Sequence, residues 1–293
     1  MYPRPIEDYH RPASLQDALR LAGSGNGQAT FIAGGMSLMQ ALKSRVLQAN
    51  RLIDLNRVAE LRGVRNEGDG LTIGAMTRYR DLAEMTGKLG AHEAIADAAR
   101  HVGDRQVRNR GTIGGSLSWN FVAACMPVVA LACGAVVHSA RTSGETVETP
   151  IDEFLQGPLS TTLQDGEIVT AIRFPAAPAG AGSAYRKWGV VTDALPVIGV
   201  CAFVETGGGR ITGGRFAVTG LQDGATRSSA AEAAMAGGLD PNDGAALATC
   251  AAAAAEELAP DGDAWISADY KSKLIADIGQ KMLETAAARA LGG

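Results

Sequence analysis

Residues 30–45, with the sequence TFIAGGMSLMQALKSR, decide how the N-terminal part of the chain folds. An apolar run stops at Gly34 and Gly35, and a helical pattern of apolar residues begins at Ser37. A strand that turns directly into a helix needs a residue without a Cβ where the backbone is tight or where a ligand approaches it. Residues 111–120, GTIGGSLSWN, repeat this device. Two such turns favour one shared ligand over two accidents of folding.

The two turns are typical of a phosphate site. A helix N-terminus presents unpaired N–H groups and a partial positive charge, and a glycine lets phosphate oxygens reach the backbone. Two facing turns would hold both phosphates of a pyrophosphate, with hydroxyl donors from Ser37, Thr112 and Ser116. The alternative is that each glycine pair only permits a tight turn, but the near repetition favours the ligand. Three arginines beside the second turn either steer phosphate or belong to a solvated loop: Arg105, Arg108 and Arg110.

Other site chemistries lack the residues that they need. Met39 stands where a G-x-S-x-G nucleophile elbow around Ser37 would have its second glycine, which argues against a serine hydrolase. The histidines lie in no recognisable catalytic motif and at no metal-ligand spacing: His10, His92, His101 and His138. The cysteines form no C-x-x-C pair: Cys125, Cys133, Cys201 and Cys250. We therefore expect no catalytic acid–base group, iron–sulfur cluster or zinc on this chain.

The composition is that of an ordinary soluble protein. Of its 293 residues, 46% are apolar and 20% are charged, and the net charge is −4. The absence of a basic block argues against a nucleic-acid or anionic-membrane partner.

Residues 121–137 are almost wholly apolar, but this segment is short for a membrane span and is interrupted by Pro127 and Gly134. We therefore expect a buried helix followed by a strand. The N-terminal residues lack the apolar core of a signal peptide, which favours a cytoplasmic protein with reduced thiols.

Periodicity and turn residues predict an α+β protein of two domains. The first would span residues 1–175, in lobes of about 1–57 and 58–175, and the second residues 176–293, with 176–182 as the linker. In the first domain we expect strands at residues 30–34, 51–56, 135–140 and 167–175 and a hairpin at 64–75. We expect helices at residues 14–22, 37–45, 77–85, 92–103 and 127–133. Ser14 would cap the first of these helices, and Thr77 would cap the third. The glycine run at residues 23–27 follows a helix, so we interpret it as a helix end and loop, not as a dinucleotide fingerprint.

The second domain shows strands first and helices after them. We expect strands at residues 183–189, 196–206 and 210–220, and helices from Arg227, Asn242 and Ser267. This order predicts an antiparallel sheet with helices on one of its faces.

With these landmarks in order, the chain resembles the FAD-binding medium subunit of the molybdenum hydroxylases, the xanthine dehydrogenase and carbon monoxide dehydrogenase flavoprotein family. IAGGMSLMQALKSR is similar to the first flavin motif of that family, A-G-G-x-S-L, and QVRNRGTIGGSL is similar to the second. LIDLNRVAELRGV, LTIGAMTRYRDL, EIVTAIRFP, SAYRKW and ISADYKSKL resemble its other landmarks, so the likeness covers nearly the whole chain.

The resemblance implies a two-lobed FAD-binding domain of the vanillyl-alcohol-oxidase (PCMH) type, followed by a C-terminal α+β domain. It places the FAD pyrophosphate against two groups of residues: Ala33, Gly34, Gly35, Met36, Ser37 and Leu38 in the first turn, and Thr112, Ile113, Gly114, Gly115 and Ser116 in the second. It places the isoalloxazine between the lobes and the C-terminal domain, near Ile168 and Lys187.

The resemblance also implies an electron-transfer role within a larger assembly. A large subunit would hydroxylate the substrate at molybdopterin, and a small subunit with two [2Fe–2S] clusters would relay electrons to the FAD of this chain, which reduces an external acceptor. The expected assembly is a dimer of heterotrimers. The alternatives are a free-standing FAD-dependent oxidoreductase and a scaffold subunit that has lost its flavin.

Two departures from the family pattern concern the cofactor. Phe121 and Cys125 stand where the family has aspartates that help to hold FAD, and residues 189–199 lack the arginines common there. We therefore expect FAD with weaker retention than is usual in the family.

Overall fold

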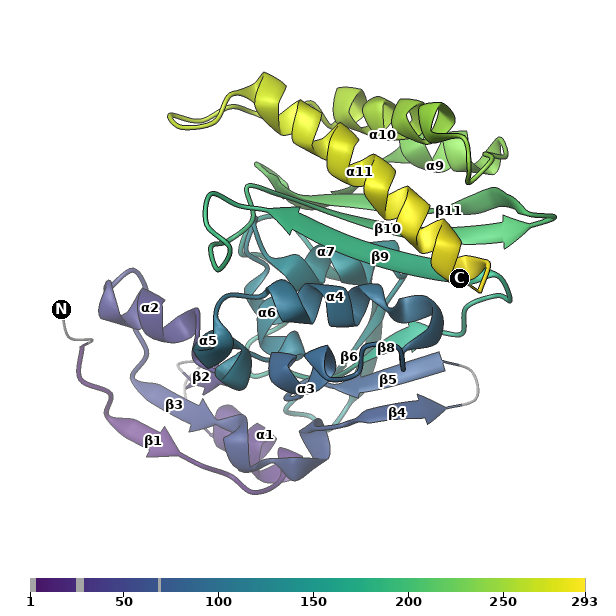
Figure 1. The fold of residues 1–293 in the computed structure, drawn as a ribbon. Helices are drawn as coiled ribbons and strands as arrows, with labels where there is room; N and C mark the ends of the chain where they lie inside the picture. Colours follow the sequence, from purple (N-terminus) through teal and green to yellow (C-terminus); the bar gives the residue numbers. More distant parts are fainter. Residues whose placement is uncertain (1–3, 25–28, 68–69, 293) are drawn as a thin grey trace.

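The computed structural model describes residues 4–24, 29–67 and 70–292, which form a mixed helix and sheet fold with three sheets (Figure 1). The helices α9, α10 and α11 lie on one face of the C-terminal sheet, and the N-terminal sheet lies at the opposite side of the molecule. This arrangement places both predicted glycine turns in the part of the chain that precedes the C-terminal sheet.

The N-terminal sheet has three parallel strands in the order β1-β3-β2. Its elements are β1 (Asp8–His10), α1 (Leu15–Gly23), β2 (Ala29–Ile32), α2 (Leu38–Lys43), β3 (Arg51–Asp54) and two 3-10 turns (Leu55–Arg57, Ala59–Leu61). The backbone N–H of Asp17 donates to the Ser14 hydroxyl at 3.1 Å, which confirms the predicted cap of α1. The glycine run expected to form a loop lies mostly outside the described residues, because these omit 25–28.

The second sheet has five antiparallel strands in the order β4-β5-β8-β6-β7. Its strands are β4 (Val64–Glu67), β5 (Gly70–Gly74), β6 (Val136–Ala140), β7 (Thr146–Pro150) and β8 (Ile168–Pro175). The hairpin, β6 and β8 are as predicted, whereas β7 is an exposed edge strand whose polar sequence gave no strand signal.

Six helices accompany this sheet: α3 (Tyr79–Ala83), α4 (Ala94–His101), α5 (Arg105–Arg110), α6 (Ile113–Trp119), α7 (Cys125–Ala132) and α8 (Ile151–Phe154). Every residue of α7 is buried, so the apolar stretch is a core helix that leads into β6, as expected. Within the described part of the chain, no helix is both long and apolar enough to cross a membrane.

One local prediction is wrong, and one of two open alternatives is excluded. The cap of α3 is Arg78 rather than Thr77, and Arg78 makes no side-chain capping bond. The Thr77 hydroxyl instead accepts from the Gly63 N–H at 3.0 Å and donates to the Gly63 carbonyl at 3.1 Å, because the adjoining strands bring this backbone within reach. The segment of Arg105, Arg108 and Arg110 is not a loop but α5, whose N-terminal N–H of Val107 is capped by Asp104 at 2.7 Å.

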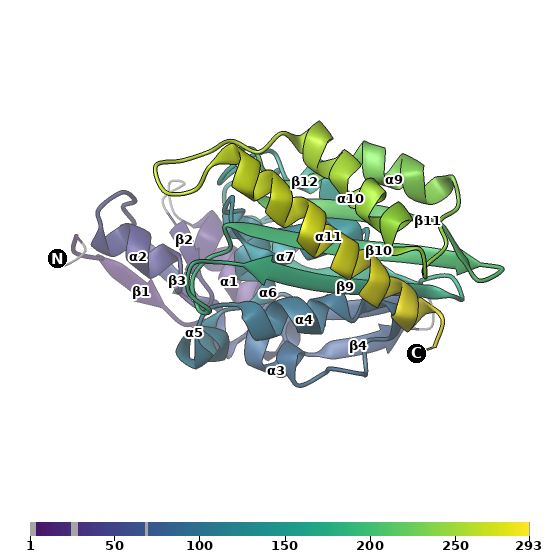
Figure 2. The ribbon, with the colours of Figure 1, turned by 45° about the horizontal axis from the view of Figure 1, so that its top comes forward.

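The C-terminal sheet is antiparallel, in the order β12-β11-β10-β9, and helices cover one of its faces as predicted (Figure 2). Its elements are β9 (Ala181–Trp188), β10 (Ile198–Gly207), β11 (Arg210–Leu221), β12 (Gly224–Arg227), α9 (Ser229–Ala236), α10 (Gly244–Leu258) and α11 (Ala268–Ala290). Buried side chains of the three helices form one core with the sheet. The opposite face packs on α4 and α7, and Tyr185, Cys201 and Phe203 join the core of the preceding part of the chain.

Candidate functional site

The first glycine turn leaves a row of backbone donors without protein acceptors. Gly35 has φ +75°, a conformation that favours glycine, and it turns the chain from β2 into α2. Among the described residues, no hydrogen-bond acceptor receives the N–H of Gly34, Gly35, Met36, Ser37 or Leu38. The Ser37 hydroxyl makes no capping bond and is exposed. Successive N–H groups around a left-handed residue form a concave anion-binding site.

The second turn is different, because its donors are already used. Thr112 caps α6 by accepting from the Gly115 N–H at 3.2 Å. The N–H of Ile113 donates to the Thr77 carbonyl at 3.2 Å, and that of Gly114 to the Ala75 carbonyl at 2.9 Å. The expectation that both turns present unpaired N–H groups is therefore wrong for these residues, since carbonyls of the segment that follows β5 lie close enough to accept them.

The structure brings the two turns into contact. A Cβ on Gly34 would lie 2.1 Å from the Arg110 carbonyl oxygen, and a Cβ on Gly115 would lie 3.6 Å from the Cβ of Ala33. Arg110 Nε also donates to the Gly34 carbonyl at 3.4 Å. Two turns that are 80 residues apart in the sequence, from Gly34 to Gly114, thus lie against each other.

Two residues that the sequence analysis did not single out connect the turns. Asn56 Nδ2 donates to the Ala33 carbonyl at 2.8 Å, and Asn56 Oδ1 accepts from Arg78 Nη2. Arg78 Nη1 donates to the Arg110 carbonyl, and the Arg78 backbone forms a bridge with Thr112. A polar residue two positions after strand β3 was the available signal for Asn56. Arg78 lies within the landmark LTIGAMTRYRDL, but nothing in that segment marked its role.

Positive charge gathers beside the turns. Arg78 is 6% exposed, and burial together with the charges of Arg62 and Arg110 lowers its pKa to about 10. Asp54 lies close by: burial opposes its ionisation, but hydrogen bonds from Tyr9 and Asn56 hold its pKa below the ordinary value. Free backbone donors and a surplus of arginines fit a dianionic diphosphate, so these residues suit a nucleotide cofactor.

The two other predicted residues, Ile168 and Lys187, lie outside the glycine turns. Ile168 is buried in a core cluster against which Ala33 packs. Lys187 donates through Nζ to the Ala194 carbonyl, and burial is the main cause that lowers its pKa. The positive charge of Lys187 acts on the Cys125 thiol, although burial raises the pKa of that thiol overall. Cys125 is 6% exposed and belongs to the core cluster.

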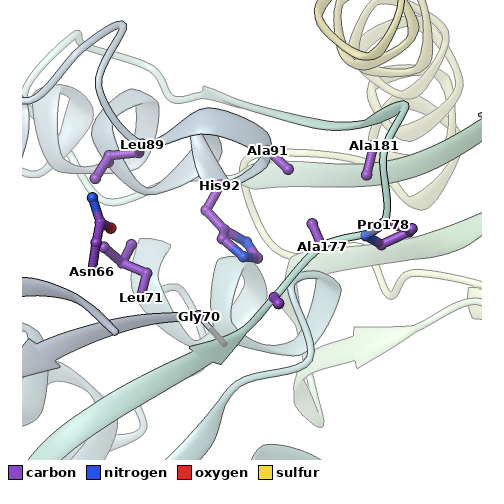
Figure 3. A pocket seen from close by; sticks show the side chains of 10 residues that line it. Asn66, Gly70, Leu71, Leu89, Ala91, His92, Ala177, Pro178 and Ala181 are labelled. Atoms are coloured by element: carbon purple, nitrogen blue, oxygen red, sulfur yellow. The ribbon is translucent and has the colours of Figure 1, made fainter. Parts of the chain in front are cut away.

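A separate pocket of about 320 Å³ lies where β8 leads into β9 (Figure 3). It is lined mainly by small and apolar side chains and by His92, whose Nε2 lies 2.9 Å from the Pro175 carbonyl. None of the residues predicted to bind FAD lines this pocket, so it is distinct from the glycine turns.

All four cysteines are free and buried, and no group of three potential metal ligands occurs among the residues that the structure describes.

Comparisons with known proteins decide the family. Residues 4–177 match the family model described as the FAD binding domain in molybdopterin dehydrogenase, and residues 183–286 match the CO dehydrogenase flavoprotein C-terminal domain. The chain belongs to this flavoprotein family. It is therefore an FAD-binding subunit of the oxidoreductase class, which confirms the resemblance seen in the sequence and the expected cofactor.

Individual members of the flavoprotein family align over almost the entire chain. The chain is 33% identical to the carbon monoxide dehydrogenase medium chain of Hydrogenophaga pseudoflava, over 97% of this chain and 98% of the relative. It is 32% identical to the 6-hydroxypseudooxynicotine dehydrogenase complex subunit alpha of Paenarthrobacter nicotinovorans, over 98% of this chain and 96% of the relative. A solved structure of carbon monoxide dehydrogenase from Hydrogenophaga pseudoflava, lacking the Mo-pyranopterin moiety of its cofactor, superposes with a TM-score of 0.89 at 36% identity, covering 99% of each chain.

Proposed function

We propose that this chain is the FAD-carrying electron-transfer subunit of a heterotrimeric molybdenum hydroxylase. It would accept electrons from [2Fe–2S] clusters of a small subunit, while a large molybdopterin subunit hydroxylates the substrate, and it would reduce an external acceptor. Relatives described as a medium chain and as a subunit of a dehydrogenase complex support a multi-subunit assembly. A dimer of heterotrimers in the cytoplasm is the form that we propose.

FAD, when bound, supplies both one-electron and two-electron redox chemistry, and the chain holds and orients it. The observation that carries the proposal is the row of free N–H groups from Gly34 to Leu38, because these donors match the oxygens of a diphosphate. The Ser37 hydroxyl adds a donor on the same turn. Thr112 to Ser116 would contact FAD through side chains and surface rather than through the N–H groups that the fold already uses.

The proposal includes the organisation of the chain. Residues 1–175 would form a two-lobed FAD-binding domain of the vanillyl-alcohol-oxidase (PCMH) type, with lobes at about 1–57 and 58–175, and residues 176–293 the C-terminal domain. The isoalloxazine would lie where these parts meet, near Ile168 and Lys187. The close packing of α4 and α7 on the C-terminal sheet supports a stable junction there.

The test is the flavin content of the native assembly. We expect the purified complex to release one FAD per copy of this chain on denaturation, with iron–sulfur absorption from its partners. FAD together with unaided turnover of a small molecule by the isolated chain would favour a free-standing oxidoreductase. An active complex without flavin would contradict the proposal and favour the scaffold alternative.

A matched pair of glycine variants locates the site. Gly35 and Gly87 have nearly the same φ, +75° and +76°, so Gly→Ala places an L residue in an unfavourable region of φ at both positions. A Cβ on Gly35 would in addition lie 3.2 Å from Met39 Cγ, whereas a Cβ on Gly87 would meet nothing within 4 Å. Only Gly35 lies in the turn with free donors. We expect Gly35→Ala to lower the FAD content of the complex and Gly87→Ala to retain it.

A further inference from the structure

Arg78 is connected to both glycine turns at once. Its backbone pairs with Thr112, and the N–H of Tyr79 donates to the Gly111 carbonyl at 3.2 Å, which fixes Arg78 beside the second turn. Its guanidinium donates to the Arg110 carbonyl through Nη1 and to Asn56 Oδ1 through Nη2. Asn56 in turn donates to the Ala33 carbonyl of the first turn at 2.8 Å.

The guanidinium is buried without a matching anion. Arg78 is 6% exposed, and among the described residues no carboxylate lies within ion-pair distance of it. Two nearby acids have other partners: Asp81 pairs with Arg80 at 3.1 Å, and Asp54 accepts from the Tyr9 hydroxyl at 2.5 Å and pairs with Arg11 at 3.3 Å. Arg62 adds a further cation, because its Nη2 donates to the Asn56 carbonyl at 2.8 Å. A buried cation without a partner is costly, so such a group implies a compensating negative charge when the site is in use.

We propose that Arg78 is a positioning residue for the FAD diphosphate: it fixes the spacing of the two turns and supplies buried positive charge that the diphosphate compensates. The inference rests on the proposed function, since it takes FAD as the ligand of the turns. Arginine suits this position because a planar guanidinium serves two acceptors in different directions while it stays charged. Lysine would keep the charge but lose the second fixed direction.

The geometry separates the two contributions of Arg78. The hydrogen bonds to Arg110 and Asn56 set where the turns lie, and the charge would favour a bound diphosphate. Loss of both contributions should weaken FAD binding about 10- to 100-fold, the range expected for hydrogen bonds that involve a charged group. Loss of the charge should also make the affinity for FAD less sensitive to salt.

The experiment compares Arg78→Met and Arg78→Lys in the intact, deflavinated complex. FAD is titrated back at several salt concentrations, and its Kd is followed by the quenching of flavin fluorescence. We expect Arg78→Met to raise the Kd for FAD about 10- to 100-fold and to make that Kd depend less on salt. For Arg78→Lys we expect a Kd between those of the native protein and Arg78→Met, with the salt dependence of the native protein. Arg80→Met is the matched control, because Arg80 lies two residues away, is exposed, and has Asp81 as its ion-pair partner among the described residues.

The outcomes are distinct. A Kd for Arg78→Met within threefold of the native value, or an equal loss in Arg80→Met, would overturn the role of Arg78. If Arg78→Met does not assemble, Arg78→Lys carries the test, and an unchanged Kd for that variant overturns the proposal. A native complex that binds no FAD would instead contradict the proposed function itself.

Discussion

Gly34 and the carbonyl group of Arg110 are in direct contact: a Cβ on Gly34 would lie 2.1 Å from the Arg110 oxygen and 2.7 Å from its carbonyl carbon. The obstacle is backbone, which cannot rotate away as the end of a flexible side chain can. The first glycine is therefore required because another turn of the chain occupies the space of its side chain.

Gly34→Ala is expected to push the two turns apart. Overpacking of this kind costs about 1–3 kcal/mol, and the separated turns should also bind FAD more weakly. The control is Gly213→Ala, because a Cβ there would meet only Glu205 Oε2, at an ordinary 3.7 Å. Thermal unfolding and FAD content of the two variants check the prediction. Equal behaviour of both variants would show that the contact at Gly34 has no special importance.

Asp54 should make the stability of the site depend on acid. Burial opposes ionisation of Asp54, but hydrogen bonds from Tyr9 and Asn56 and the charge of Arg11 hold its pKa below the ordinary value. A depressed carboxyl pKa stabilises the folded state above the unfolded value, near 4, and this contribution is lost as pH falls through the folded value. We expect Asp54→Asn to flatten the fall in stability below about pH 4. Urea midpoints at pH 7, 4 and 3 measure this.

The control for Asp54 is Asp81→Asn, whose carboxylate pairs with Arg80 at the exposed end of α3. That variant should retain the acid dependence of the native protein. If Asp54→Asn loses stability in parallel with the native protein at every pH, the acid sensitivity has another source.

The salt bridge between Asp97 and Arg289 should stabilise the junction of the C-terminal sheet with the rest of the chain. Asp97 on α4 is 5% exposed, and Arg289 on α11 reaches it with Nη1 at 2.7 Å from Oδ2. Arg289 also donates to the Ser183 carbonyl at 2.6 Å. We expect Arg289→Met to lower the free energy of unfolding by about 2 kcal/mol. This loss is smaller than that for a buried ion pair that loses its only partner, because Arg100 still contacts Asp97. Urea unfolding measures the change.

An exposed pair provides the comparison for this junction. Arg20 and Asp17 lie 3.2 Å apart on α1 with 67% and 51% of their side chains exposed, so Arg20→Met should change the stability by less than about 1 kcal/mol. Similar losses in both variants would mean that the buried position of Asp97 adds nothing.

The thiols are expected to be unreactive in the folded protein. All four cysteines are buried; burial raises the pKa of Cys125 and raises that of Cys250 to about 11, whereas hydrogen bonds with Cys201 and His92 lower the pKa of Cys133 to about 5. Because a reagent must reach the sulfur and Cys133 is only 1% exposed, a thiol reagent should modify none of the four quickly under native conditions and all four in denaturant. Rapid modification of one thiol in the native protein would contradict this packing.

Strong local signals made much of the fold predictable. Ser14 before an amphipathic run marked the start of α1, and the C-terminal order of strands and helices was sufficient to place the helices on one sheet face. Weak signals failed where distant segments decided the outcome. Thr77 has the residue type of a helix cap, but its hydroxyl contacts Gly63 instead, because the strands place Gly63 next to it.

By itself, the sequence determined the family, the FAD cofactor expected for it and the two turns, because glycine patterns and helix starts are local properties of the chain. Only the tertiary structure decided which turn has free donors and what joins the turns. The N–H groups of Ile113 and Gly114 are used by carbonyls of the segment that follows β5, and Arg78 reaches the first turn through Asn56. The first of these contacts joins backbone groups that every residue carries, and the second joins side chains 22 residues apart in the sequence, so no local pattern of residue types announces either of them.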